Sequence, residues 1–245
     1  MDNNVNVIAE CGINFDSIET ACRMIAYAKT AEAKFVKFQL FNKETIKDSP
    51  VKDRLEPLIL TESDIETLRN CATENEVGFI LTPMYMEAVE LAAKHCDYIK
   101  IRYADHDNEE LINKALDTGK TLLISVPIKP IGAMMYHLRI RYLYCLPSYP
   151  PKPEDFDIDL ASTCQGVSLH YPHTLFDLAY AVDRCYEECF IEKHVEPDMI
   201  PGWANDGLTI NFKPIDHAVS ITFEQLRIFT EQLKLIEQMR RKPKI

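Results

Sequence analysis

A glutamate and a histidine stand two residues apart in a short, mostly apolar run, Phe190-Ile191-Glu192-Lys193-His194. Side chains at positions i and i+2 of a β-strand leave on the same side, so the carboxylate of Glu192 and the imidazole of His194 are expected to share a face. The loop behind this run carries Asp198, Trp203 and Asp206. Parallel α/β folds place their chemistry at such strand ends, which makes this stretch a candidate site.

Cations stand at the ends of two further strand-like runs. Lys37 and Gln39 share one face of the run 35–40, and Lys100 and Arg102 share one face of the run 98–102. A lysine at a strand end is commonly a surface residue whose stem lies along apolar atoms, and that alternative stays open. If these cations converge, they form a small basic pocket that suits a phosphate or a carboxylate, with serine and threonine hydroxyls as neutral donors.

Histidines at neighbouring strand ends suggest a metal site. His194 ends one strand, and the preceding strand offers His170 and His173. Adjacent strands lie ~4.8 Å apart, so imidazoles at their ends can bind one divalent cation together. Carboxylates such as Glu10 or Asp206 could complete the ligand set. A lone histidine is more often structural, but a pair in a polar region favours a metal.

The elements that must position these residues alternate regularly along the chain. Apolar runs predict strands at 5–11, 35–40, 78–84, 98–102, 121–127, 141–146, 166–170 and 190–194. Helical spacing lies between them, with Asp16 or Ser17 as one N-cap, a capping box at 61–64, a helix expected at 131–138 and a closing helix within 221–245. Eight such alternations predict an α/β fold, a single-domain (β/α)8 TIM barrel over residues 1–245. An open doubly wound sheet is the alternative.

Composition narrows the class of protein. The chain has 245 residues, 47% of them hydrophobic, and a net charge of −11, which argues against a nucleic-acid or anionic-membrane partner. The start of the sequence lacks the features of a signal peptide, and no apolar run approaches a membrane span, so we expect a cytoplasmic protein. The eight cysteines form no C-x-x-C pair and lie mostly in apolar runs, which favours reduced buried thiols over disulfides or zinc ligands.

Six short motifs occur in the order and rough spacing of the sialic acid synthase family. They are Ile8-Ala9-Glu10-Cys11-Gly12-Ile13-Asn14, Lys37-Phe38-Gln39, Thr82-Pro83, Lys100-Ile101, Ser148-Tyr149-Pro150 and Glu192-Lys193-His194. The chain resembles this family, which includes N-acetylneuraminate synthases and their legionaminate, pseudaminate and spore-coat relatives, from Val5 to about Phe212. The resemblance implies a TIM barrel that condenses phosphoenolpyruvate with an N-acetylated amino-sugar aldehyde. The products would be a nonulosonic (sialic-type) acid and phosphate. It also implies a divalent metal, Mn²⁺ or Mg²⁺, and a homodimer.

The resemblance assigns roles to individual residues. It implies that phosphoenolpyruvate is bound by Lys37, Thr82, Lys100, Ser125 and Ser168, within a basic pocket that includes Arg102. It implies sugar contacts for Gln39 and Tyr149, and acid/base candidates at Glu10, Asp105 and Asp206. His194 resembles one metal ligand. The second is His170 if Ser168-Leu169-His170 stands for the family's Ser-Asp-His, which we prefer, or else His173, which the spacing to His194 favours.

Several positions depart from the family pattern. Arg102-Tyr103-Ala104-Asp105 stands where the family has Pro-Ser-Gly-Glu, and Val126-Pro127 stands where it has Thr-Gly. The sequence also ends before the antifreeze-like C-terminal domain that holds the sugar in the family. Two alternatives therefore stay open. The barrel would use another aldehyde acceptor, or it would be a catalytically silent module that binds a sugar acid or a partner protein.

Overall fold

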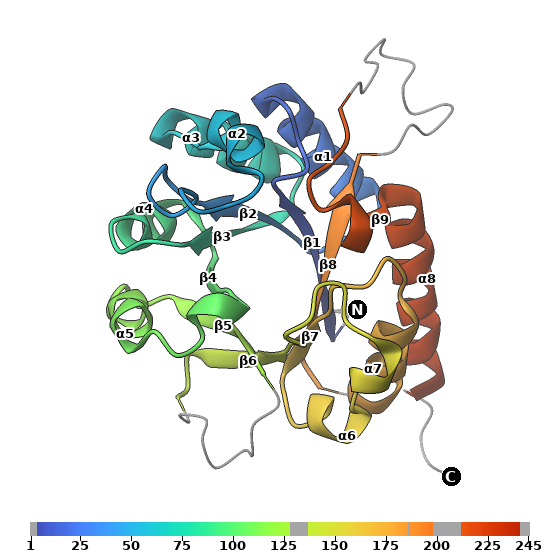
Figure 1. The fold of residues 1–245 in the computed structure, drawn as a ribbon. Helices are drawn as coiled ribbons and strands as arrows, with labels where there is room; N and C mark the ends of the chain where they lie inside the picture. Colours follow the sequence, from blue (N-terminus) through green and yellow to red (C-terminus); the bar gives the residue numbers. More distant parts are fainter. Residues whose placement is uncertain (1–3, 128–136, 186, 198–211, 241–245) are drawn as a thin grey trace.

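Eight parallel strands form the core of the protein. The computed structural model describes residues 4–127, 137–185, 187–197 and 212–240. The strands pair in chain order and the eighth pairs back with the first, which closes the sheet into a barrel (Figure 1). They are β1 (Val5–Gly12), β2 (Phe35–Leu40), β3 (Gly78–Pro83), β4 (Tyr98–Ile101), β5 (Thr121–Val126), β6 (Ile140–Tyr144), β7 (Gly166–Ser168) and β8 (Cys189–Glu196). The predicted single-domain (β/α)8 barrel is confirmed.

Helices surround the barrel on the outside (Figure 1). They are α1 (Ile18–Thr30), α2 (Lys52–Leu55), α3 (Glu62–Glu74), α4 (Ala88–His95), α5 (Glu109–Asp117), α6 (Ile158–Ala161), α7 (Leu175–Arg184) and α8 (Phe223–Arg240). Ser17 rather than Asp16 caps α1, because its hydroxyl accepts the Thr20 N–H at 3.1 Å. The predicted capping box of Thr61 and Asp64 begins α3. Most of the helix predicted at 131–138 lies outside the described residues.

The end of the described chain closes the barrel from outside. The predicted helix over 221–245 begins later than expected, because Ile221–Thr222 form a short strand, β9, that pairs with β8 at Val195. Helix α8 then buries Phe223, Leu226, Phe229 and Leu233. Its Glu237 carboxylate accepts the backbone N–H of Val5 at 3.0 Å, which ties α8 to the first strand. Across the described residues, no helix combines the length and the apolar character that a bilayer span requires.

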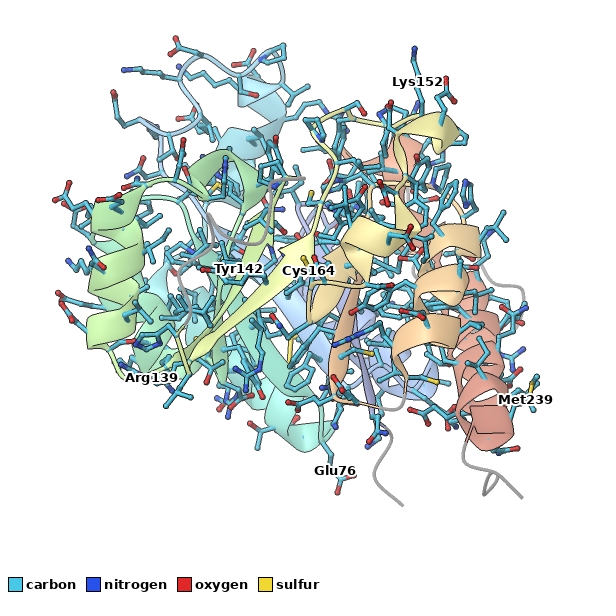
Figure 2. The ribbon with its side chains drawn as sticks, turned by 90° about the horizontal axis from the view of Figure 1, so that it is seen from below. Glu76, Arg139, Tyr142, Lys152, Cys164 and Met239 are labelled. Carbon is cyan, nitrogen blue, oxygen red and sulfur yellow. A yellow bond between two sulfur atoms is a disulfide. The ribbon has the colours of Figure 1, made fainter. Side chains whose placement is uncertain are left out.

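The inside of the barrel contains two layers of different character. The layer at the amino ends of the strands, which we call the floor, is apolar and consists of Ile8, Phe35, Ile80, Tyr98, Leu123, Leu143 and Phe190. Because strand side chains repeat every two residues, a second inward-facing layer lies two residues further along the same strands. We call it the mouth; it contains Glu10, Lys37, Thr82, Lys100, Ser125, Ser168 and Glu192, all buried. In Figure 2, Arg139, which precedes β6, and Lys152, which follows it, lie at opposite ends of the barrel.

The prediction that all eight cysteines are reduced is wrong for two of them. Cys22 of α1 and Cys71 of α3 form a disulfide, with their Cα atoms 5.8 Å apart. The other six cysteines form no disulfide within the described residues and are buried, as predicted. The pair is 49 residues apart in sequence and meets only because α1 and α3 pack side by side on the barrel. Sequence spacing therefore gave no sign of it.

Candidate active site

A cavity of about 350 Å³ opens at the carboxyl ends of the strands. Parallel barrels gather the ends of all eight strands at this face, so residues far apart in sequence meet there. Most of the predicted site residues line the cavity: Lys37, Gln39, Thr82, Lys100, Arg102, Ser125, Tyr149, Ser168, His170 and His194. Glu192, Tyr103 and Asp216 line it as well. The structure thus brings together residues from six of the eight strands and the loops that follow them.

Lys37 of β2 is buried between two carboxylates. Its Nζ lies 2.5 Å from Glu10 Oε2 and 3.6 Å from Glu192 Oε1, and it donates a hydrogen bond to Thr82 Oγ1 at 3.3 Å. Burial alone lowers the pKa of Lys37, but the two carboxylates outweigh it, so the pKa is raised. Lys37 is therefore a permanently charged ammonium held in a fixed position.

Lys100 of β4 has a different environment. Its Nζ donates to Ser125 Oγ at 2.6 Å and to the Ile101 carbonyl at 3.1 Å, while its nearest carboxylate oxygen, on Glu192, is 4.0 Å away. Burial lowers the pKa of Lys100, and the positive charge of Lys37 adds to this effect. An ammonium that has no carboxylate in close contact is well suited to receive an anionic ligand.

Glu10 of β1 is completely buried behind the cavity wall. Its Oε1 accepts a hydrogen bond from Gln39 Nε2 at 2.7 Å, while its Oε2 pairs with Lys37. Gly12 follows in the left-handed conformation with φ +47°, and a Cβ there would lie 2.6 Å from Glu10 Oε1. Glycine is required at this position both for its backbone angle and for the room it leaves to the carboxylate.

Glu192 of β8 is the second buried carboxylate. Its Oε1 accepts the hydroxyl of Ser168 at 2.9 Å, and its Oε2 accepts no hydrogen bond from any described residue. Burial raises the pKa of Glu192, but the charges of Lys100, Lys37 and His194 together lower it overall. The sequence had indicated that Glu192 shares a face with His194, and both side chains do line the cavity.

His170 and His194 lie next to each other at the rim. Their ring centroids are 5.1 Å apart. Burial, aided by the nearby His194, lowers the pKa of His170 to about 3, so this imidazole is neutral. His173 lies elsewhere: its ring stacks on Tyr171 at 4.9 Å and contacts Phe176, and it does not line the cavity.

Asp216, which was not predicted as a site residue, faces the two imidazoles. Its Oδ2 lies 3.1 Å from His194 Nδ1, and its Oδ1 accepts the hydroxyl of Tyr149 at 2.7 Å. Asn14 fixes it from behind, because Asn14 Oδ1 accepts the Asp216 N–H at 2.9 Å. Although burial lowers the pKa of His194, the Asp216 carboxylate raises it overall. The one available signal was Asn14, which belongs to the first motif.

Of the other predicted acids, one lies outside the described residues and one does not line the cavity. Asp206 falls outside the described residues, as do Trp203 and Asp198. Asp105 does not line the cavity; its Oδ2 instead accepts the Arg102 Nε–H at 2.5 Å. Asp105 therefore orients Arg102, whose guanidinium forms part of the wall.

A second group of potential metal ligands lies on the outside of the barrel. Among the described residues, Glu62, Glu66 and His95 are the one group of three whose ligand atoms all lie within 4.8 Å. They belong to the outer helices α3 and α4, and both glutamates are exposed. The Lys94 ammonium already lies 2.5 Å from Glu62 and 3.9 Å from Glu66, so this group has its own counter-ion. The pair of imidazoles at the mouth, predicted from the sequence, is the other candidate metal site.

Solved structures of several proteins share this fold. A sialic acid synthetase from Leptospira borgpetersenii superposes with a TM-score of 0.80 at 21% identity, over 98% of this chain and 86% of that one. A putative spore coat polysaccharide biosynthesis protein E from Chromobacterium violaceum gives 0.75 at 19% identity, over 98% and 77%. SpsE from Bacillus subtilis, a spore coat polysaccharide biosynthesis protein, gives 0.72 at 20% identity, over 97% and 70%. At these identities the likeness establishes the fold.

Comparison at the level of sequence identifies the family. No curated protein matches the chain. The model of the NeuB family, however, matches residues 24–244, which is most of the sequence. The chain belongs to the NeuB family.

Proposed function

We propose that the protein condenses phosphoenolpyruvate with an N-acetylated amino-sugar aldehyde to give a nonulosonic acid and phosphate. The observation that carries this proposal is the pair of buried ammonium groups, Lys37 and Lys100, beside the hydroxyls of Thr82 and Ser125 in one cavity. Phosphoenolpyruvate carries a phosphate and a carboxylate, and both need cations and hydroxyl donors in a site that excludes bulk water.

The two lysines have different roles in binding this anion. The charge of Lys37 is already paired with the Glu10 carboxylate at 2.5 Å. Lys37 therefore mainly fixes that carboxylate, and its remaining N–H groups can donate to the substrate. Lys100 is the ammonium that an incoming phosphate can pair with, since its closest contact is the neutral Ser125 hydroxyl at 2.6 Å. Ser168 and Arg102 also line the cavity and add donors.

The rim fits a divalent metal by the chemistry of its donors. His170 is neutral, so a ring nitrogen lone pair is available; its ring lies beside that of His194 with centroids 5.1 Å apart, and Asp216 Oδ2 lies 3.1 Å from His194 Nδ1. Imidazole and carboxylate ligands together suit cations such as Mn²⁺. When bound there, the metal would polarise the aldehyde of the acceptor as a Lewis acid.

The chain's own residues account for the remaining steps. The enol carbon of phosphoenolpyruvate forms a bond to the aldehyde carbon, whose oxygen takes the electron pair of the broken C=O π bond and then a proton. Water then adds to the electron-poor carbon that still bears the phosphate oxygen. Of the two buried strand carboxylates, Glu10 and Glu192, it is Glu192 that lines the cavity, and we assign it the proton from this water, with Glu10 as the alternative acceptor. The C–O bond to phosphate then breaks, and Lys100 stabilises the charge on the departing phosphate.

The wall of the cavity suggests that the acceptor differs from that of the family pattern. Tyr103 and Arg102 line the cavity where the family has serine and proline. The Tyr103 ring stacks on His106 with centroids 5.3 Å apart, which gives this side of the cavity a flat aromatic surface. A related aldose is therefore the alternative acceptor. The homodimer implied by the resemblance and the cytoplasmic location expected from the sequence features stay predictions.

Phosphate release tests the proposal. Purified protein would be incubated with phosphoenolpyruvate, Mn²⁺ and each of a panel of N-acetylated hexosamines and other aldoses, with inorganic phosphate as the readout. We expect release that requires both the metal and one class of aldose. Release of phosphate without any acceptor would point to a phosphatase. No release with any acceptor, combined with binding of a nonulosonic acid, would leave the silent binding module.

A further inference from the structure

Lys193, between the two cavity residues of β8, points away from the cavity and is fully buried. Its Nζ donates to the carbonyl oxygens of Tyr171 at 3.1 Å and His173 at 2.9 Å, and lies 3.4 Å from that of Leu169. It also pairs with Asp177 Oδ2 of α7 at 3.1 Å. We propose that Lys193 is a positioning residue, whose ammonium holds the backbone on both sides of His170 so that its imidazole stays beside His194.

The segment that carries His170 needs such a support. The register between β7 and β8 ends where Ser168 pairs with Glu192, so the ladder of the barrel does not extend to residue 170. Beyond that pair, carbonyl groups buried against the barrel still need donors. A single ammonium has three hydrogens that can point in different directions, and here they reach carbonyls spread over five residues.

The alternation of β8 explains why this lysine adjoins the site. Glu192 and His194 point inward, so the residue between them must point outward, toward α7 and the loop after β7. A buried ion pair is weak evidence for stability, because desolvating the two charges can outweigh their attraction. The backbone contacts around His170 give the pair another purpose, which is to set the position of one proposed metal ligand. Partners that orient a ligand in this way commonly change metal affinity 10–100-fold when removed.

The test is the affinity for Mn²⁺ alone, measured by titration calorimetry, and it rests on the metal site of the proposed function. Removing Lys193 alone would leave Asp177 as an unpaired buried charge, so the variant replaces both, Lys193→Met with Asp177→Leu. We expect a folded protein whose dissociation constant for Mn²⁺ rises about 10–100-fold. If this variant does not fold by circular dichroism and thermal melting, Lys193→Gln with Asp177→Asn decides by the same criterion.

A matched lysine separates positioning from general stability. Lys120 Nζ donates to the Cys96 carbonyl at 2.8 Å, just before β5 and therefore at the other end of the barrel. Lys120→Met should lower the melting temperature and leave Mn²⁺ affinity unchanged. Equal Mn²⁺ affinity in the wild type and the folded double variant would overturn the role of Lys193 and leave the metal site intact. Failure of the wild type to bind Mn²⁺ would reject the metal site and this inference together.

Discussion

The floor and the mouth of the barrel are built largely from the same strands, yet the floor is apolar and the mouth is charged and polar. Each of six strands contributes one residue to each layer, in the pairs Ile8 and Glu10, Phe35 and Lys37, Ile80 and Thr82, Tyr98 and Lys100, Leu123 and Ser125, and Phe190 and Glu192. The floor is apolar and packs ring against ring, with Phe35 and Tyr98 centroids 5.3 Å apart. The mouth holds four charged groups, all of them buried. The two-residue repeat of the strands thus places an apolar layer and a charged, cavity-lining layer on the inside of the same barrel.

Stability alone does not explain the mouth. Burying charges is unfavourable unless they are paired and hydrogen-bonded, and an apolar set of similar volume would often be as stable or more so. The charges balance, with Glu10 and Glu192 against Lys37 and Lys100, but the pairing is uneven. Lys37 takes the short contact to a carboxylate, while Lys100 stays 4.0 Å from one. That unequal pairing is what an anion-binding site requires, and the following predictions test the contrast between the layers.

The largest effect on stability is expected in the floor. Phe190 is 1% exposed and packs on the rings of Phe35 and Tyr98, so Phe190→Ala would leave a cavity in the centre of the barrel. We expect the free energy of unfolding to fall by about 3–5 kcal/mol, measured by urea denaturation. Phosphate release per folded molecule should stay within a few-fold of the wild type. A loss of activity as large as that of a mouth variant would contradict the division into two layers.

The largest effect on chemistry is expected in the mouth. Lys100→Met keeps the length of the side chain and removes the ammonium that faces the cavity. We expect kcat/KM for phosphate release to fall about 10²–10³-fold, because one charge-stabilising donor is lost. The free energy of unfolding should fall less than in Phe190→Ala, because the cost of burying the ammonium disappears while Glu192 loses part of its countercharge. Lys120→Met, at the other end of the barrel, is the control and should keep its activity.

A smaller effect is expected at the rim, where two histidines of one loop can be compared. His170→Ala should weaken Mn²⁺ binding about 10–100-fold or more, because a ligand beside His194 is lost. His173→Ala should leave Mn²⁺ affinity unchanged, since its ring packs on Tyr171 outside the cavity. Titration calorimetry on both variants measures the difference. The opposite order of effects would show that the second ligand is His173.

The smallest effect is a change in pH dependence. The lysines lower the pKa of Glu192 below its ordinary 4.5, so its contribution to stability is present above pH 4.5 and is lost as the pH falls through the folded value. Glu192→Gln removes this acid-labile contribution. Below pH 4.5 its unfolding free energy should therefore fall less steeply, by up to about 1.4 kcal/mol per pH unit. Urea denaturation at several pH values between 5 and 3 compares the slopes, and parallel slopes would contradict the charge pairing in the mouth.

Much of this barrel could be predicted from the sequence, for a physical reason. Inward-facing and outward-facing residues alternate along each strand, so Lys37, Gln39, Lys100 and Glu192 could be placed on one face before any coordinates were known. The carboxyl ends of parallel strands all meet at one face of a closed barrel. That rule alone brought cations, hydroxyls and imidazoles together from distant parts of the chain.

The parts that could not be predicted depend on contacts between distant loops and helices. Asp216 lies in a loop without periodicity, and it reaches His194 only because Asn14 of the first loop holds its backbone. The Cys22–Cys71 disulfide depends on two outer helices packing together. Asp105 was predicted as an acid/base candidate of the site. Its carboxylate lies in a turn and bonds the neighbouring Arg102 rather than facing the cavity. The choice between His170 and His173 required the position of each ring.

Binding of phosphoenolpyruvate, followed by calorimetry in the presence of Mn²⁺, tests the central claim most directly. The proposed site predicts that the wild type and Phe190→Leu, a floor variant that keeps most of the volume, bind with similar affinity. It predicts that Lys100→Met shows no measurable binding. Equal binding by Lys100→Met and the wild type, or no binding by the wild type, would show that the buried lysines of the mouth do not form a phosphoenolpyruvate site.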